Sequence, residues 1–412
     1  MVSPDAPRVA IITFGCKVNF FESEQLAASL GSYRMVGQSE EADIYIINGC
    51  TVTAAADAQV RSMARRLARH GATVIVTGCY ARVEDRHRAT DGAIKYLSDI
   101  GAVAAALGGR VDDSFVVWRA RPVLKIEDGC VGSCAYCTIP LVRGSSIRST
   151  DPAIIEKHLH RLAAAGYREV VLTGIHVGKY GFDRPDGVTL ADIVEMAYEI
   201  IGRVRLSSIE PDEIDDRLLT LAAAGKILPH WHIPLQSGSN PILRAMRRSY
   251  DTALFAEKIN AIYAAYPEQP AVGTDIIVGF PGETEDDFED TCVLVSSLPL
   301  TYGHIFPFSP RRGTEAWEMH HRFPVPFAVK KRRARFLREV CAAKKRSFQN
   351  AQVGRTMAMI LEKQLGTTSF EGTTDTYFQL PYRGRGAVRD LKKVVIKKEG
   401  SLFYAEEVER AL

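Results

Sequence analysis

The sequence predicts an α/β protein in three parts: an N-terminal open parallel βαβ domain, a central partial parallel βα barrel and a small C-terminal β-barrel. Apolar, β-rich runs alternate with helical patterns up to residue 78, and again from residue 123 to about 320. A final segment of alternating residues and Gly-rich turns indicates the third part. For a chain of 412 residues we expect domains at residues 1–115, 116–350 and 351–412.

The first alternation places strands near residues 8–13, 43–48 and 73–78, with helices near 20–30 and 54–70 between them. Parallel strands need crossovers of about helix length, and this βαβαβ pattern provides them. It therefore predicts a parallel sheet.

The second alternation predicts a partial or complete parallel barrel of five or six βα units. Helix starts are marked by Asp151 followed by Pro152, and by Ser239 and Thr284 as N-caps. A long basic helix follows near residues 329–350. The expected strands are 123–128, 169–174, 204–208, 230–235, 274–280 and 304–309.

Composition and charge indicate which binding partners and which cellular compartment to expect. A formal charge of +3 is only mildly basic, so an RNA-binding surface would need local clusters of Lys and Arg. Neither a signal peptide nor an apolar run of membrane-spanning length is found, so we expect a cytoplasmic protein with no membrane contact. The eight cysteines are then expected as reduced thiols, and closely spaced ones as metal or cluster ligands.

Cys130, Cys134 and Cys137 follow a predicted strand with the spacing C-x3-C-x2-C. A structural zinc site normally has a fourth Cys or His, but the next histidine is His158, inside a predicted helix. Three thiolates can instead hold a 4Fe-4S cluster and leave one iron open for a substrate or cofactor.

Cys16, Cys50 and Cys79 form a second set, each just beyond a predicted strand and each preceded by glycine. The carboxyl ends of parallel strands meet at one edge of a sheet, so these thiols are expected to converge on one site. Three unrelated buried thiols are the alternative interpretation.

The motif around Cys130, with the aromatic Tyr136 before the last cysteine, resembles the radical S-adenosylmethionine superfamily. The resemblance implies that the open iron binds S-adenosylmethionine and that an electron cleaves it to a 5′-deoxyadenosyl radical. A barrel would shield that radical from water.

When Cys16, Cys50 and Cys79 are considered together with the motif around Cys130, nearly the whole chain resembles the methylthiotransferase family. The resemblance implies two 4Fe-4S clusters, one of them auxiliary and held by Cys16, Cys50 and Cys79, and two uses of S-adenosylmethionine. It also implies an electron donor such as flavodoxin or ferredoxin, and a sulfur donor. The matching segments are residues 15–24, 50–57, 77–81, 125–144, 170–181, 232–239 and 275–284.

Three branches of this family are known, acting on isopentenyladenosine in tRNA, on threonylcarbamoyladenosine in tRNA, or on an aspartate of a ribosomal protein. The runs 16–19 (CKVN) and 50–53 (CTVT) look like the threonylcarbamoyladenosine branch, MtaB. The expected product is adenosine methylthiolated at C2, next to the anticodon. Both other branches stay open as alternatives, as does a non-catalytic iron-sulfur protein that binds RNA. Gly49 and the pair Gly132-Ser133 depart from the family pattern.

The C-terminal segment, with residues 372–380, resembles the TRAM domain, a β-barrel that grips RNA. The anticodon stem-loop of tRNA is the expected partner. Aromatic rings could stack on bases and cations could neutralise phosphates, although core aromatics and a solvated charged face would look the same in sequence. The RNA-binding candidates are Arg311, Lys330, Lys331, Tyr377 and Arg383, with Phe378 beside Tyr377.

Family position suggests further contacts around S-adenosylmethionine. Glu210 could bind its ammonium group or ribose, or be only a surface carboxylate before Pro211. No residue is assigned as a general acid or base, and Cys292 and Cys341 are interpreted as structural thiols. The cofactor-binding candidates are Tyr136, Gly174, Glu210, Gln236, Ser237 and Asp275.

Overall fold

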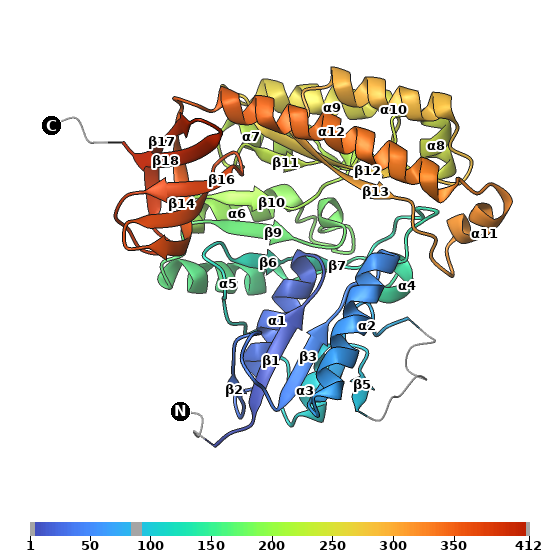
Figure 1. The fold of residues 1–412 in the computed structure, drawn as a ribbon. Coiled ribbons are helices and arrows are strands. Elements are labelled where there is room, and N and C mark those ends of the chain that lie inside the picture. The colour runs from blue at the N-terminus through green and yellow to red at the C-terminus, as the bar shows by residue number, and fades with distance from the viewer. Residues whose placement is uncertain (1–4, 84–92, 409–412) are drawn as a thin grey trace.

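The computed structural model describes residues 5–83 and 93–408. An N-terminal sheet and a C-terminal barrel both adjoin a central part, in which helices cover parallel strands (Figure 1). No helix among the described residues is both long and apolar enough to cross a membrane.

The N-terminal sheet has five parallel strands in the order β2-β1-β3-β4-β5. Successive side chains of a strand point to opposite faces, and helices cover both faces here. Ile12 packs in one core with Val60 of α2, and Ile11 packs in another with Leu26 of α1. The elements are β1 (Arg8–Thr13), α1 (Lys17–Ser29), β2 (Arg34–Met35), β3 (Ile44–Asn48), α2 (Ala54–Arg69), β4 (Thr73–Thr77), β5 (Ile94–Tyr96) and α3 (Ile100–Ala106).

The register of this sheet aligns the ends of its three central strands. Thr13 pairs with Asn48, and Asn48 pairs with Thr77. The loops after β1, β3 and β4 therefore leave the sheet at one level, as the sequence predicts.

The central part has two three-stranded parallel sheets, β6-β9-β10 and β11-β12-β13. They join where Leu228 N–H donates to the carbonyl of Val204 and Ile209 N–H donates to that of His232. Among the described residues no pairing connects β13 to β6, so the predicted barrel is partial. Its strands are β6 (Val123–Lys125), β9 (Val170–Thr173), β10 (Val204–Leu206), β11 (His230–His232), β12 (Ala271–Val278) and β13 (Tyr302–Pro307).

Helices and a short hairpin complete the central part. The hairpin pairs β7 (Glu127–Asp128) with β8 (Arg148–Ser149). The helices are α4 (Ile139–Arg143), α5 (Pro152–Ala164), α6 (Leu190–Ile201), α7 (Asp216–Ala223), α8 (Asn240–Ala245), α9 (Thr252–Ala265), α10 (Glu285–Ser297), α11 (Glu315–Arg322) and α12 (Phe327–Ala351), with 3-10 turns η2 (Val177–Lys179) and η3 (Pro211–Glu213).

Two of the three predicted N-caps are confirmed. Asp151 accepts from the N–H of Ala153, and Thr284 forms a capping box with Asp287. Ser239 precedes α8 but does not cap it, because its hydroxyl donates to Asp287 Oδ1 at 2.5 Å.

The C-terminal segment forms a closed barrel in the strand order β14-β15-β16-β18-β17, which confirms the predicted small β-barrel. Its core includes Met359, Phe370, Tyr382 and Val394. The strands are β14 (Thr356–Gly366), β15 (Ser369–Thr374), β16 (Gln379–Arg383), β17 (Leu391–Glu399) and β18 (Leu402–Glu407).

A buried ionic cluster joins this barrel to the central strands. Glu169 is fully buried, and its carboxylate lies 2.9 Å from Arg203 and 3.0 Å from Arg205. Arg203 also pairs with Asp375 at 2.6 Å, and Arg205 donates to the carbonyl of Thr374. Glu169 therefore holds in place two guanidinium groups that contact the barrel.

Replacing Glu169 by glutamine is expected to lower the free energy of unfolding by about 3–5 kcal/mol, because the buried Arg205 loses its carboxylate partner and Arg203 is left with Asp375. Burial raises the pKa of Glu169, but Arg205, Arg203 and Arg121 outweigh it and hold the pKa below its usual value. The stabilisation is therefore complete above the unfolded pKa of roughly 4.3 and is lost as pH falls through the lower folded pKa.

Urea denaturation of both chains at neutral pH and near the folded pKa measures this difference. Glu195→Gln is the matched control, since Glu195 pairs with Arg217 and Lys226 at the surface, where solvent screens the charges, and should change stability far less. Equal losses in the two variants would contradict the prediction.

Candidate active site

Three cysteines gather at the carboxyl edge of the N-terminal sheet. Cys16 follows β1 and is exposed, Cys50 follows β3 and is partly buried, and Cys79 follows β4 and is buried. A Cβ built on Gly15 would lie 3.2 Å from Cys50 Cβ, so the first two loops are in contact. Burial raises the pKa of Cys79 to about 11 and also raises that of Cys50, and the nearby Cys16 acts in the same direction on both. The three thiols therefore share one site.

This donor set fits an iron-sulfur cluster. With pKa values above neutral, the Cys50 and Cys79 thiols are protonated without metal, so coordination would release protons. None of the eight cysteines is in a disulfide, and Cys292 and Cys341 lie on α10 and α12. Three thiols at this edge are the number that leaves one iron of a 4Fe-4S cluster open.

Buried hydrogen bonds of two asparagine side chains stabilise the carboxyl edge of the N-terminal sheet. Asn19 Nδ2 donates to Asn48 Oδ1 at 2.9 Å, and Asn48 Nδ2 donates to Ser23 Oγ at 3.0 Å. These bonds attach the start of α1 to the end of β3. They orient the loop that carries Cys16, whose thiol donates to Asn19 Oδ1 at 3.2 Å.

Gly49 departs from the family pattern for a steric reason. A Cβ at this position would lie 2.9 Å from a methyl of Val60 and 3.0 Å from Tyr80 Cβ. The packing of α2 against this loop therefore leaves no room for a larger residue.

Cys130, Cys134 and Cys137 lie in the loop between β7 and α4. The N–H of Gly132 donates to Cys130 Sγ at 3.3 Å, and that of Ile139 donates to Cys137 Sγ at 3.4 Å. Burial raises the pKa of Cys137 to about 12. A Cβ on Gly132 would lie 3.2 Å from Cys130 Sγ and 3.8 Å from Cys134 Sγ, so glycine keeps the space between two sulfurs open. The loop therefore also fits a cluster held by three cysteines.

Arg248 organises the surroundings of this loop. Its Nη1 donates to Cys134 Sγ at 3.1 Å and to Tyr136 Oη at 3.4 Å, and its Nη2 pairs with Glu210. Burial raises the pKa of Glu210 to about 7, against the opposite effect of Arg248. Two predicted cofactor residues, Tyr136 and Glu210, thus lie beside the cysteine loop.

Three other cofactor candidates, Gly174, Gln236 and Ser237, lie in different surroundings from those of Tyr136 and Glu210. A Cβ on Gly174 would lie 2.4 Å from Glu127 Oε2, so this glycine makes room for a side chain of the protein itself. Gln236 has a φ of 64°, in the left-handed region. The structure does not support Ser237 as a cofactor ligand, because its hydroxyl is buried 3.5 Å from Thr291 Oγ1 on α10.

Asp275 belongs to a histidine network on β11, β12 and β13. Its Oδ1 lies 3.0 Å from His232 Nε2 and 3.1 Å from His304 Nδ1. The hydroxyl of Tyr302 lies 2.8 Å from His230 Nε2 and 3.2 Å from His232 Nδ1. These side chains project from three adjacent strands toward one cavity.

Two RNA-binding candidates are engaged inside the protein. Arg311 Nη2 donates to Thr51 Oγ1 at 2.9 Å and to Asp57 Oδ2 at 2.7 Å, so it joins the central part to the loop after Cys50. Lys330 is 7% exposed and its ammonium donates to the carbonyl of Phe308. The prediction that these two side chains contact RNA phosphate is not supported, because their charged groups are turned inward.

The remaining candidates divide between surface and cavity. Lys331 is exposed, and the exposed Arg383 pairs with Glu399 at 3.3 Å. Phe378 lies in the core of the C-terminal barrel and cannot stack on a base there. Tyr377, with a φ of 62°, lines the cavity, stacks on His230 at 4.2 Å between ring centroids and stays 39% exposed.

A cavity of about 890 Å³ lies where the three parts of the chain meet. Cys16 and Lys17 line it from the N-terminal part, Asp275 and His304 from the central strands, and Tyr377 from the C-terminal barrel. One auxiliary-set cysteine therefore faces the same space as the strands of the partial barrel.

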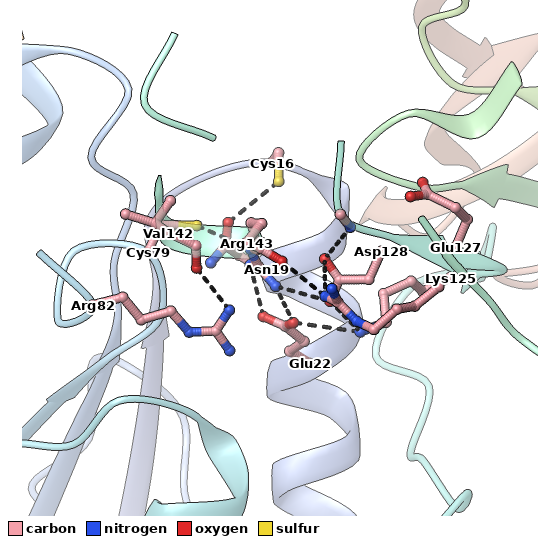
Figure 2. A network of polar contacts seen from close by, with 12 residues as sticks. Cys16, Asn19, Glu22, Cys79, Arg82, Lys125, Glu127, Asp128, Val142 and Arg143 are labelled. Atoms are coloured by element: carbon pink, nitrogen blue, oxygen red, sulfur yellow. Dashed lines mark hydrogen bonds and ion pairs between the residues drawn. The ribbon is translucent and has the colours of Figure 1, made fainter. Parts of the chain in front are cut away.

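The sequence-based predictions missed Arg143, at the end of α4. This side chain donates to Cys79 and to Glu22, although it belongs to the loop and helix that follow Cys137 (Figure 2). Its only signal in the sequence is its place in the matching segment 125–144. Roles for Arg248, Glu22 and the histidine network were missed as well, although Glu22 and His232 lie in the matching segments 15–24 and 232–239.

Two family models match separate segments of the chain. A family model described as "Uncharacterized protein family UPF0004" matches residues 8–96. The model of the Radical SAM superfamily matches residues 124–295. The first match contains Cys16, Cys50 and Cys79, and the second contains Cys130, Cys134 and Cys137.

Curated relatives cover nearly the whole chain. The threonylcarbamoyladenosine tRNA methylthiotransferase MtaB of Bacillus subtilis is 35% identical over 95% of this chain and 94% of its own length. The protein of the same name from Aquifex aeolicus is 33% identical over 94% of this chain and 100% of its own.

A solved structure shares the fold. The radical S-adenosylmethionine methyltransferase TsrM from Kitasatospora setae superposes with a TM-score of 0.52 and 11% identity, covering 77% of this chain and 76% of that one. The two family matches and the nearly full-length relatives show that the chain belongs to the radical S-adenosylmethionine methylthiotransferase family and is an enzyme of that kind.

Proposed function

We propose that the protein is a cytoplasmic tRNA-modifying enzyme that adds a methylthio group to C2 of N6-threonylcarbamoyladenosine next to the anticodon. It would use two 4Fe-4S clusters and two molecules of S-adenosylmethionine, with an external electron donor and an external sulfur donor. The names of the curated relatives support this substrate. The observation that carries the proposal is the cavity shared by Cys16, the barrel strands and Tyr377.

The chain supplies two separate cysteine sets for these tasks. When bound, one cluster would supply the electron that cleaves S-adenosylmethionine, and the other would hold the sulfur to be transferred. Cys130, Cys134 and Cys137 would hold the first cluster, and the set with Cys16 would hold the second. The partial barrel and its covering helices would shield the reacting carbon from water.

The cavity lining suits a substituent that carries a carboxylate. Lys17 follows Cys16 directly, and cations outnumber carboxylates in the cavity lining: Lys17, Arg119, Arg121, Arg205 and Lys363 against Asp275, Glu362 and Glu371. Threonylcarbamoyl groups end in a carboxylate, whereas an isopentenyl group is apolar and gains nothing from cations. This charge favours the threonylcarbamoyladenosine branch over the isopentenyladenosine branch.

Replacing Lys17 by methionine is expected to raise KM for tRNA carrying threonylcarbamoyladenosine about tenfold, since a hydrogen bond to a charged group contributes roughly 1.5–3 kcal/mol. Cleavage of S-adenosylmethionine without tRNA should not change. Lys95→Met is the control, because Lys95 is exposed on β5 at the edge of the N-terminal sheet. An unchanged KM would remove Lys17 from substrate binding.

The proposal is tested by anaerobic reconstitution with iron and sulfide, followed by incubation with S-adenosylmethionine, reductant and tRNA. Three substrates are compared: tRNA with threonylcarbamoyladenosine, tRNA with isopentenyladenosine, and ribosomal protein. Mass spectrometry of nucleosides and peptides should show the methylthio gain on the first alone. A gain on either of the others would reassign the branch, and no gain despite cofactor cleavage would overturn the tRNA assignment.

A further inference from the structure

Arg143 connects the two cysteine sets. It ends α4, six positions after Cys137, and its side chain is fully buried. Its Nε donates to Cys79 Sγ at 3.1 Å, across the boundary to the N-terminal sheet (Figure 2). A residue of the radical-site loop therefore contacts a cysteine of the auxiliary set directly.

Two carboxylates fix the orientation of this guanidinium group. Nη1 and Nη2 each bond one oxygen of Glu22 on α1, and Nη2 does so at 2.9 Å. Nη1 also lies 3.5 Å from Asp128 Oδ2. With both terminal nitrogens on carboxylates, Nε is left to point at the sulfur, which is the planar geometry that only arginine offers.

The charged side chains around this contact carry a net positive charge that a thiolate could balance. Arg143, Lys125 and Arg148 are the cations, and Glu22 and Asp128 are the carboxylates that pair with them. Three positive and two negative charges leave one positive charge in excess. A thiolate at Cys79, as iron coordination requires, would balance it.

We infer that Arg143 is a positioning residue of the auxiliary cluster: it donates a hydrogen bond and a positive charge to the Cys79 sulfur and thereby raises the reduction potential of that cluster. The inference rests on the proposed function, which places a cluster on Cys16, Cys50 and Cys79. Hydrogen bonds to ligand sulfurs and nearby charge are among the factors that set such potentials. A donor to sulfur stabilises the more negative, reduced form.

If Arg143 only attached α4 to the N-terminal part, replacing it would not change the reduction potential of the cluster. Arg82 provides the matched control for this alternative. Arg82 Nη1 donates to the carbonyl of Val142 at 3.0 Å, and its Nε donates to the carbonyl of Ser98. It therefore attaches the same helix to the N-terminal part, but through backbone oxygens rather than a sulfur (Figure 2). Arg82→Gln should weaken this attachment and leave the potential unchanged.

The experiment uses the full-length chain with Cys130, Cys134 and Cys137 replaced by alanine, so that only the auxiliary site can assemble a cluster. After anaerobic reconstitution, the cluster is titrated with dithionite and redox mediators and followed by electron paramagnetic resonance. Arg143→Gln is expected to lower the reduction equilibrium constant about tenfold, or about 59 mV for a one-electron couple. Arg143→Lys keeps a charge without the planar fork and should give a smaller shift.

Arg143→Gln alone leaves Glu22 buried without its main partner and could prevent folding. The double variant Glu22→Gln, Arg143→Gln removes a positive and a negative charge together, so mainly the loss of the hydrogen bond to Cys79 remains, and it should lower the potential by less than Arg143→Gln. No shift in the variants that assemble a cluster, or an equal shift in Arg82→Gln, would overturn the inference. Absence of any cluster in the parent chain would instead count against the proposed function itself.

Discussion

Replacing Cys134 by alanine is expected to abolish cleavage of S-adenosylmethionine to 5′-deoxyadenosine. The cluster at this loop needs all three thiolates, and a missing ligand removes the site at which the cofactor is bound and reduced. Iron bound per chain should fall by about half, to about four atoms, since the auxiliary site is untouched. Chromatographic detection of 5′-deoxyadenosine and iron analysis measure both quantities.

Cys292→Ala is the matched control for this experiment. Cys292 is partly buried on α10, outside both cysteine sets, and its replacement should leave iron content and cofactor cleavage unchanged. If the Cys134 variant still cleaved S-adenosylmethionine, the assignment of this loop would be wrong.

Replacing Cys50 by alanine is expected to separate the two activities. The radical site stays intact, so S-adenosylmethionine is still cleaved, but methylthio transfer should stop because the sulfur to be transferred has no cluster to hold it. The variant is well suited to this test because the Cys50 sulfur accepts a weak backbone hydrogen bond from Val52 at 3.5 Å, whereas the hydrogen bond of Arg143 goes to Cys79.

Cofactor cleavage and the methylthiolated nucleoside are quantified in the same reaction. Cys341→Ala is the control here, since Cys341 lies on α12, outside both cysteine sets, with its side chain in the central core. Methylthio transfer by the Cys50 variant at the parent rate would show that this cysteine set does not carry the transferred sulfur. Loss of both activities would show that the two sites cannot be separated.

The strand pattern and both cysteine sets could be predicted because their signals are local. A buried parallel strand gives a short apolar run, and a cysteine directly after it must lie near the end of that strand. Since neighbouring parallel strands end at one edge, Cys16, Cys50 and Cys79 could be assigned to one site from sequence, and the register of Thr13, Asn48 and Thr77 agrees.

Charged side chains were the least predictable feature. Arg311 and Lys330 look like RNA-binding cations in the sequence, but the structure turns both inward, onto Asp57 and onto the carbonyl of Phe308. Tyr377 and Phe378 are adjacent, yet one faces the central cavity and the other the core of the C-terminal barrel. A charge or a ring does not reveal its partner, because the partner is distant in the chain.

The sequence by itself determined the fold class, the two cysteine sets and the family to which they belong. Only the tertiary structure decided how the sets are connected: Arg143 reaches Cys79, 64 positions earlier in the chain, and Glu22, 121 positions earlier. Spacing within a loop or beyond a strand is fixed by local backbone geometry, which a sequence pattern records. A buried ion pair between two distant segments depends instead on how those segments dock, and no local pattern encodes that.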